Sequence, residues 1–152
     1  EQYKEELLWA LQLSNIGKTL TIYKAHQHAF YIAMQELNYG FSHKQIILTS
    51  LLLRMHEKEL FNKPLFQKFK LLLPEKQTFL WLSFIYTLIV LLHEDSNAAN
   101  ITFTYQNKTL YIKSDKSLYL AKEAIKALKK PIPFAIIIED EEYIPKYETL
   151  GI

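Results

Sequence analysis

Hydrophobic residues recur at intervals of three and four positions through the first 96 residues, which is the spacing of amphipathic helices. The pattern predicts four helices before the most apolar part of the chain, over residues 3–13, 24–38, 42–60 and 65–73. Asn15–Gly17 is a C-cap type of sequence, and Gly40 would act as a left-handed stop. Ser42 and Gln45 have the spacing of a capping box, and Asn62–Pro64 would break the third helix.

The most apolar stretch is Phe79–Leu92, an uncharged run of fourteen residues. A helix that spans a bilayer needs roughly 18 apolar residues, so this run is too short for that role. A helix that is apolar on every side is packed all round by other elements. We therefore expect a central core helix, with Pro74 in its first turn and His93 at its negatively polarised end.

Beyond residue 100 the periodicity changes from the helical spacing to strict alternation. The pattern predicts a β-β-α-β order, with strands at 101–105 and 110–112 around a turn at 106–108, a helix at 118–129 and a strand at 134–138. Ser117 would cap the helix. The β-branched run Phe134–Ile138 suits a strand that is covered on both faces or that pairs in the middle of a sheet.

These elements predict an α+β fold, with a helical domain over residues 1–96 and a smaller α+β unit over residues 97–152. The net charge of +2 hides an uneven distribution. Residues 1–138 hold 17 basic and 11 acidic side chains, whereas residues 139–152 form an acidic tail that we expect to be peripheral. The positive surplus of the body would favour polyanions near the surface, although an ordinary solvated surface has the same composition.

Composition excludes several kinds of chemistry. With only three glycines, the chain has no P-loop and no G-x-G-x-x-G motif, which argues against a self-sufficient nucleotide enzyme. Zero cysteines exclude disulfides and thiolate zinc sites, and fit a reducing, cytoplasmic compartment. The start of the chain, EQYKEELL, lacks the pattern of a signal peptide, and a first residue other than Met leads us to expect a piece of a longer protein.

The histidines are the remaining candidates for chemistry. His26 and His28 are two residues apart, so on a regular helix their side chains diverge by about 200° and meet at one site only if the helix start is irregular. A metal ion held by His26, His28 and His56 would also need a carboxylate. The alternatives are a structural role for all three, or anion binding together with the basic residues beside His56.

Four stretches, taken in order, resemble the C-terminal region of the exopolyphosphatase and guanosine pentaphosphate phosphohydrolase family. They are Leu13-Ser14-Asn15-Ile16-Gly17, similar to L-H-E-I-G; His26-x-His28-x-x-Tyr31, similar to H-x-H-S-x-Y; Tyr39-Gly40-Phe41-Ser42 with Arg54-Met55-His56-Glu57-Lys58, similar to G-F-S and Y-H-R-K; and the central helix running into Leu91-Leu92-His93-Glu94-Asp95-Ser96, similar to L-R-L-A-x-L-L-x-R-S. The resemblance extends to about residue 138.

The resemblance implies that the parent protein cleaves terminal phosphates from polyphosphate or pppGpp. Catalysis in this family takes place in N-terminal actin-like domains that use magnesium, so the part resembled here would be an HD-like helical domain with a small α+β appendage. In the family this part helps to form dimers and to line the path of the polyanion. The family's His-Glu pair is Ser14-Asn15 here, so an HD-type metal site would lack its central pair.

The resulting expectation is a non-catalytic C-terminal domain of a homodimeric phosphohydrolase, without a cofactor of its own and without membrane or nucleic-acid partners. Polyphosphate or (p)ppGpp would contact basic side chains, with Lys68 and Lys70 at the rim. The expected contacts are His26, His28, Arg54, His56, Lys58, Lys68 and Lys70. Two alternatives stay open: a divergent HD-type hydrolase with a metal on His26, His28 and His56, and a structural domain that dimerises through Phe134–Ile138.

Overall fold

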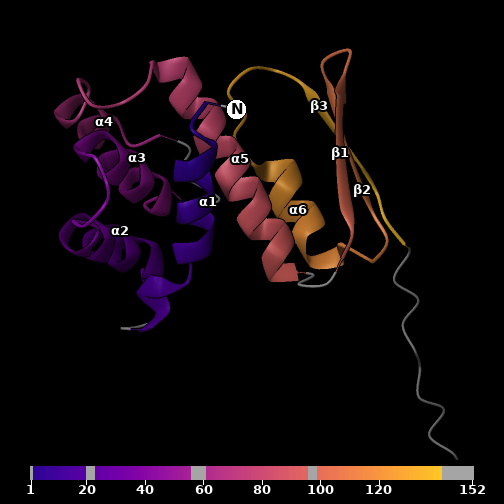
Figure 1. The fold of residues 1–152 in the computed structure, drawn as a ribbon. Coiled ribbons are helices and arrows are strands. Elements are labelled where there is room, and N and C mark those ends of the chain that lie inside the picture. Colours follow the sequence, from indigo (N-terminus) through magenta and orange to yellow (C-terminus); the bar gives the residue numbers. More distant parts are fainter. Residues whose placement is uncertain (1, 20–22, 56–60, 96–98, 142–152) are drawn as a thin grey trace, which may run out of the picture.

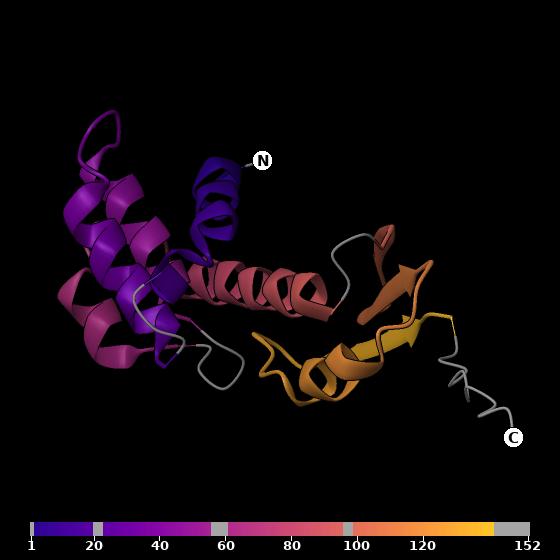
Figure 2. The same cartoon turned by 90° about the horizontal axis from the view of Figure 1, so that it is seen from below.

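The twenty-residue helix α5 (Lys76–Asp95) lies between two groups of elements in the computed structural model of the protein (Figure 1). The structure describes residues 2–19, 23–55, 61–95 and 99–141. Helices α1 to α4 lie on one side of α5, and helix α6 with a three-stranded sheet lies on the other, as a second view also shows (Figure 2). This arrangement confirms the predicted α+β fold class, which is mainly helical.

The first group of helices follows the predicted order. It consists of α1 (Lys4–Leu13), the short 3₁₀ helix η1 (Ile16–Thr19), α2 (Ala25–Glu36), α3 (His43–Leu53) and α4 (Lys63–Lys68). The predicted capping box at the start of α3 is confirmed. The Ser42 hydroxyl accepts a hydrogen bond from the amide of Gln45 (3.3 Å), and the Ser42 amide donates to the Gln45 side chain (2.9 Å). Together they satisfy two amides that the helix itself leaves without acceptors.

Helix α5 is buried on two faces because its apolar residues occupy positions all round the helix. Phe79 and Tyr86, seven residues apart and therefore on one face, pack with α1 to α4. Phe84 and Leu88 pack on the other face with α6 and the sheet. The prediction of a core helix surrounded by other elements is confirmed, and the proposed domain boundary near residue 96 stays a prediction.

The helix is longer than the apolar run from which it was predicted. By length and composition alone, residues 76–94 would be sufficient to cross a membrane. Core helices of globular proteins meet the same criterion, and both faces of α5 here contact other parts of the protein. The absence of a membrane partner therefore stays a prediction.

The sheet has the order β1-β2-β3, with strands Ile101–Gln106, Thr109–Ser114 and Ala135–Glu139. Strand β1 is antiparallel to β2, and β3 is parallel to it. The β1–β2 hairpin turns at Asn107 and Lys108, which both have positive φ values (48° and 56°). A two-residue loop of this kind matches the twist of the strands it joins. Helix α6 (Tyr119–Ala127) connects β2 to β3 and packs on the face that carries Ile112.

The prediction of a central or doubly covered strand at residues 134–138 is wrong. Among the residues that the structure describes, strand β3 pairs with β2 alone and forms an edge of the sheet. Phe134 precedes the strand and packs with its ring 5.6 Å from Trp81 and 5.4 Å from Phe84. Ile137 points to the other face of the sheet and is 42% exposed. An uninterrupted apolar run therefore contributes one face to the core and leaves the other face uncovered.

Two predicted helix boundaries also differ from the structure. Helix α3 ends at Leu53 and not near residue 60, and residues 56–60 lie outside the described residues. Asn62–Pro64 starts a new helix, because the Asn62 side chain accepts a hydrogen bond from the amide of Leu65 (3.1 Å) and Pro64 occupies the first turn. That helix is shorter than predicted and ends at Lys68.

Two predicted features at helix starts are not present. Helix α5 begins at Lys76, so Pro74 precedes the helix instead of lying in its first turn. No side chain caps α6 in the manner expected of Ser117. Pro74 and Ser117 each lie two positions before the first helical residue.

Asp140, which the sequence assigned to a peripheral tail, instead joins β3 to α6. Its Oδ2 accepts a hydrogen bond from the amide of Leu118 (2.7 Å), and its Oδ1 pairs with Lys122 (2.5 Å). Burial alone would raise the pKa of Asp140, but the hydrogen bonds from Lys122 and Leu118 outweigh it and hold that pKa below its ordinary value. The carboxylate also lies at the positively polarised start of α6.

Candidate functional site

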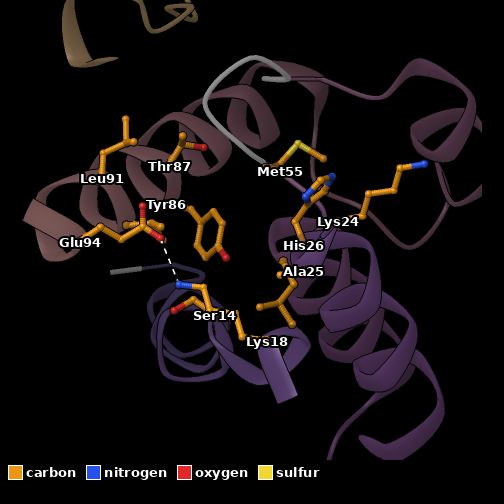
Figure 3. Close-up of a pocket in the computed structure, with 12 residues that line it drawn as sticks. Ser14, Lys18, Lys24, Ala25, His26, Met55, Tyr86, Thr87, Leu91 and Glu94 are labelled. Carbon is orange, nitrogen blue, oxygen red and sulfur yellow. Dashed lines mark hydrogen bonds and ion pairs between the residues drawn. The ribbon is translucent and has the colours of Figure 1, made fainter. Parts of the chain in front are cut away.

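A pocket of about 350 Å³ opens between η1, the start of α2, the end of α3 and the C-terminal half of α5 (Figure 3). Four titratable side chains and three hydroxyl side chains contribute to its walls, and the remaining wall residues are apolar. These seven residues are Lys18, Lys24, His26, Glu94, Ser14, Tyr86 and Thr87. Elements that are far apart in the sequence thus meet around one cavity.

Gly17 allows η1 to pack directly against α2. A Cβ atom at this position would lie 1.8 Å from the carbonyl oxygen of Ala25 and 2.7 Å from the amide nitrogen of Ala29. Backbone atoms cannot move aside as a flexible side chain can, so the contact requires glycine. The sequence predicted that Asn15–Gly17 would cap the end of the first helix. The structure instead places Ser14 at that end, where its hydroxyl donates to a carbonyl of α1 (2.8 Å). Because η1 packs against α2 at Gly17, the next residue, Lys18, is held at the wall of the pocket.

An ion pair crosses the pocket between η1 and α5. Lys18 Nζ lies 3.4 Å from Glu94 Oε1, as the dashed line marks (Figure 3). Both side chains are about half exposed, at 45% and 55%. Exposed pairs of this kind contribute about 0–1 kcal/mol to stability because water screens them. The pair is therefore a feature of the pocket's charge and not a main support of the fold.

Tyr86 places a hydroxyl group at the base of the pocket. The residue is 4% exposed, and its ring extends from α5 into the cavity (Figure 3). Among the described residues its hydroxyl makes no hydrogen bond. Burial, and to a smaller degree the negative charge of Glu94, raises the pKa of Tyr86, so the phenol stays protonated and can donate a hydrogen bond.

The structure separates the two histidines of the second stretch. His26 lines the pocket at the start of α2, whereas His28 is not among the pocket residues. Both positions lie within regular helix, so their side chains diverge as the two-residue spacing requires. Arg54 follows α3 between two wall residues, Leu53 and Met55. It is half-buried, and its Nη1 atom is buried without a hydrogen-bond partner among the described residues.

The predicted rim residues do not join this pocket. Lys68 and Lys70 are exposed at the end of α4 and in the turn after it, and Lys68 lies over the ring of Phe69 (5.3 Å). His56 and Lys58 lie outside the described residues. Of the seven predicted contacts, the described part of the chain therefore brings only His26 into the wall of the cavity.

A metal site is the second possibility that the sequence left open. Within residues 2–19, 23–55, 61–95 and 99–141, no three His, Asp or Glu side chains lie close enough together to hold a metal ion. The candidate set of His26, His28 and His56 includes a residue outside these ranges, so that site stays a prediction.

Sequence reasoning missed Lys18, Lys24, Tyr86 and Glu94. One signal was present for Tyr86, which is the only residue with a phenolic hydroxyl in the apolar run of the central helix. Lys18, Lys24 and Glu94 show no local sequence pattern that distinguishes them from the other charged residues of the chain. Their common location depends on how η1, α2 and α5 pack, which no local pattern describes.

Each of the four stretches that carry the family resemblance contributes part of its length to this pocket, although Tyr39–Ser42, in the third stretch, does not line it. The first supplies Ser14, the second His26, the third Met55 and the fourth Glu94. Their wide separation in the sequence, together with their shared position in space, indicates that the pocket is the feature these motifs have in common.

Two comparisons with known proteins give different results. No curated protein matches the chain. In contrast, the family model described as Ppx/GppA phosphatase, domain III, matches residues 1–129, a span that runs from the start of the chain to just beyond α6. Because this match covers most of the sequence, the protein belongs to the Ppx/GppA phosphatase family, in which it corresponds to domain III.

Proposed function

We propose that this domain is a non-catalytic C-terminal part of an exopolyphosphatase or pppGpp phosphohydrolase, and that it contributes binding sites for phosphate polymers or nucleotides. The catalytic step, with its magnesium, would take place in actin-like domains of the same parent chain, in the cytoplasm. The HD-like character that the resemblance implies belongs to this proposal as well.

The observation that carries the proposal is the pocket to which each of the four family stretches contributes. Among the described residues, Lys18 and His26 supply positive or protonatable groups to its walls, against the carboxylate of Glu94. Lys24 lines the rim, and its ammonium lies over the ring of Tyr23 (5.2 Å). The start of α2 adds the positive end of a helix dipole. A cavity with this balance of charge favours an anion over a cation, which agrees with a phosphate-processing family.

Titration of the chain with long-chain polyphosphate, at low and at high salt, tests the binding role. We expect binding at low salt that weakens steeply as salt increases, because each contact releases counterions from the polymer. The double variant Lys24→Gln with His26→Gln should reduce the slope of log K against log salt by roughly one unit per lost contact. Lys113→Gln, on the exposed face of the sheet, is the matched control and should leave the slope unchanged.

The binding proposal fails if the folded chain does not bind polyphosphate at low salt. It also fails if Lys113→Gln lowers the slope as much as the double variant does, because the polymer would then be attracted by overall charge alone. Circular dichroism of each variant confirms that the helices are intact before binding is compared.

The second part of the proposal is dimerisation, which the uncovered face of the sheet favours. Tyr111 and Ile137 are neighbours in the β2–β3 register, and both are exposed, at 36% and 42%. Ile136, the neighbouring position, packs instead against the second hydrophobic cluster, so a charge placed there would disturb the core. Ile137→Lys is therefore the informative change.

Sedimentation velocity of wild type and Ile137→Lys tests this surface. We expect the wild-type chain to sediment as a dimer and Ile137→Lys as a monomer, because a lysine would have to be desolvated in the interface. Leu71→Lys, which places the same change at a 95% exposed position in the turn after α4 and away from the sheet, serves as the control for added charge. A variant dimer as stable as the wild-type dimer would exclude this face.

A further inference from the structure

Tyr86 is largely buried, but its hydroxyl faces the pocket and makes no hydrogen bond within the described part of the protein. The residue is 4% exposed, and its ring enters the pocket from α5 (Figure 3). A phenol that faces a cavity, with its proton retained, is suited to donate to a ligand in that cavity.

The start of α2 faces the same cavity and is also incompletely capped. Lys24, the residue before the helix, makes no side-chain cap hydrogen bond, and it has the left-handed conformation (φ 53°) that disfavours one. Lys24, Ala25 and His26 all line the pocket. The amides of Gln27 and His28 donate to the carbonyl of Lys24 (2.9 and 3.3 Å), so the helix start favours an anion chiefly through its dipole.

We propose that this pocket binds a single phosphate group, which accepts a hydrogen bond from the Tyr86 hydroxyl and lies at the positively polarised start of α2. Lys18 supplies the counter-charge, and His26 supplies a further donor. The phosphate class of the ligand rests on the proposed function, whereas the geometry itself calls for a small anion. The pocket is open to solvent and has a volume of about 350 Å³, which is sufficient for a phosphate group together with waters or neighbouring atoms of a larger ligand.

Glu94 is the group that opposes an anion in this position. Its carboxylate is held by Lys18 in the ion pair across the pocket. Because exposed ion pairs are weak, Lys18 can exchange the Glu94 carboxylate for a phosphate at little cost. The ion pair therefore acts as a competitor for the ligand, so loss of the Glu94 charge should strengthen binding.

Titration of the chain with orthophosphate, followed by the amide NMR signals of α2, tests the proposal. Tyr86→Phe removes only the hydroxyl and keeps the ring that packs in the core. It should weaken phosphate binding about tenfold, the loss expected for one hydrogen bond to a charged acceptor. Its melting temperature should be unchanged or higher, because the hydroxyl has no partner in the unliganded protein. Tyr111→Phe, on the exposed sheet face, is the control and should bind as wild type does.

A second variant keeps the test independent of Tyr86. Glu94→Gln preserves the shape of the side chain, removes the competing charge and frees Lys18, so it should bind orthophosphate several-fold more tightly. Unchanged or weaker binding by Glu94→Gln would overturn the proposal. Orthophosphate binding by Tyr86→Phe with wild-type affinity would overturn it as well.

Parallel titrations with tripolyphosphate and long-chain polyphosphate distinguish the single-phosphate site from the proposed binding of phosphate polymers. If long chains bind and Tyr86→Phe has no effect on any ligand, the single-phosphate site is wrong and the polymer role stands. If orthophosphate binds as described and long chains do not bind, the site stands and the polymer role is wrong. Binding of tripolyphosphate with the same loss in Tyr86→Phe would identify the ligand as the end of a chain and support the site.

Discussion

The close contact at Gly17 leads to a strong prediction for stability. In Gly17→Ala, the new methyl group would lie 1.8 Å from the Ala25 carbonyl oxygen and 2.7 Å from the Ala29 amide nitrogen. Both are backbone atoms of α2, so η1 and α2 must separate to make room. Overpacking of this kind costs about 1–3 kcal/mol, and rigid backbone partners favour the upper end of that range.

One smaller effect reduces this estimate. Alanine restricts the unfolded chain more than glycine does, which stabilises the folded state by roughly 0.4–1 kcal/mol and opposes the clash. The expected net loss for Gly17→Ala is therefore about 2 kcal/mol. For a chain of this size, each kcal/mol lowers the melting temperature by roughly 2–4 °C, so we expect a decrease of about 4–8 °C.

Thermal unfolding followed by circular dichroism measures this change, and Gly40→Ala provides the matched control. Gly40 has a positive φ of 81°, yet a Cβ there would meet nothing within 4 Å. Its replacement should cost only the left-handed strain of an L-residue, about 1–2 kcal/mol before the same unfolded-state gain. A Gly17→Ala protein as stable as wild type, or more stable than Gly40→Ala, would refute the argument that a backbone contact requires this glycine.

Two further predictions concern contacts that the structure shows at helix starts. Ser42→Ala removes half of the capping box with Gln45 and should lower the unfolding free energy by about 1 kcal/mol in urea titrations; no change would mean that water caps α3 equally well. Asp140→Asn should destabilise the protein at pH 7 by about 1–2 kcal/mol, through weaker bonds to Leu118 and Lys122. Because the folded pKa of Asp140 is lowered, its contribution is complete above the unfolded value near 3.9 and is lost as the pH falls through the folded value. Wild type and Asp140→Asn should therefore converge in stability in acid, and a constant difference down to pH 2 would contradict this assignment.

Local patterns were sufficient for most of the secondary structure. The helical spacing of apolar residues identified the helices of the first 96 residues, and the alternation after residue 100 identified the hairpin and the β-β-α-β order. The capping box at Ser42 was also readable, because a cap depends on residues only three positions apart. The phosphatase family could likewise be recognised from four short motifs, and the match to domain III confirms it.

Contacts between distant residues were beyond the reach of those patterns. The sequence could not show that β3 lies at the edge of the sheet, because an apolar run is compatible with an edge or a central strand. It could not show that Asp140, in an acidic tail, would bond to the start of α6. It attributed Gly17 to a helix end, although the reason for glycine is the approach of another helix.

The candidate site depends on tertiary structure more than the fold does. From the sequence, His26 and His28 were equal candidates, and only the orientation of α2 decides that His26 faces the pocket. Lys18, Tyr86 and Glu94 come from two elements almost seventy residues apart, and their chemistry arises from their meeting. Residue spacing determines periodicity, caps and turns within an element, whereas packing between elements determines which side chains share a cavity. For this protein, the sequence alone therefore determined the elements and the family, and the tertiary structure decided which side chains share the pocket.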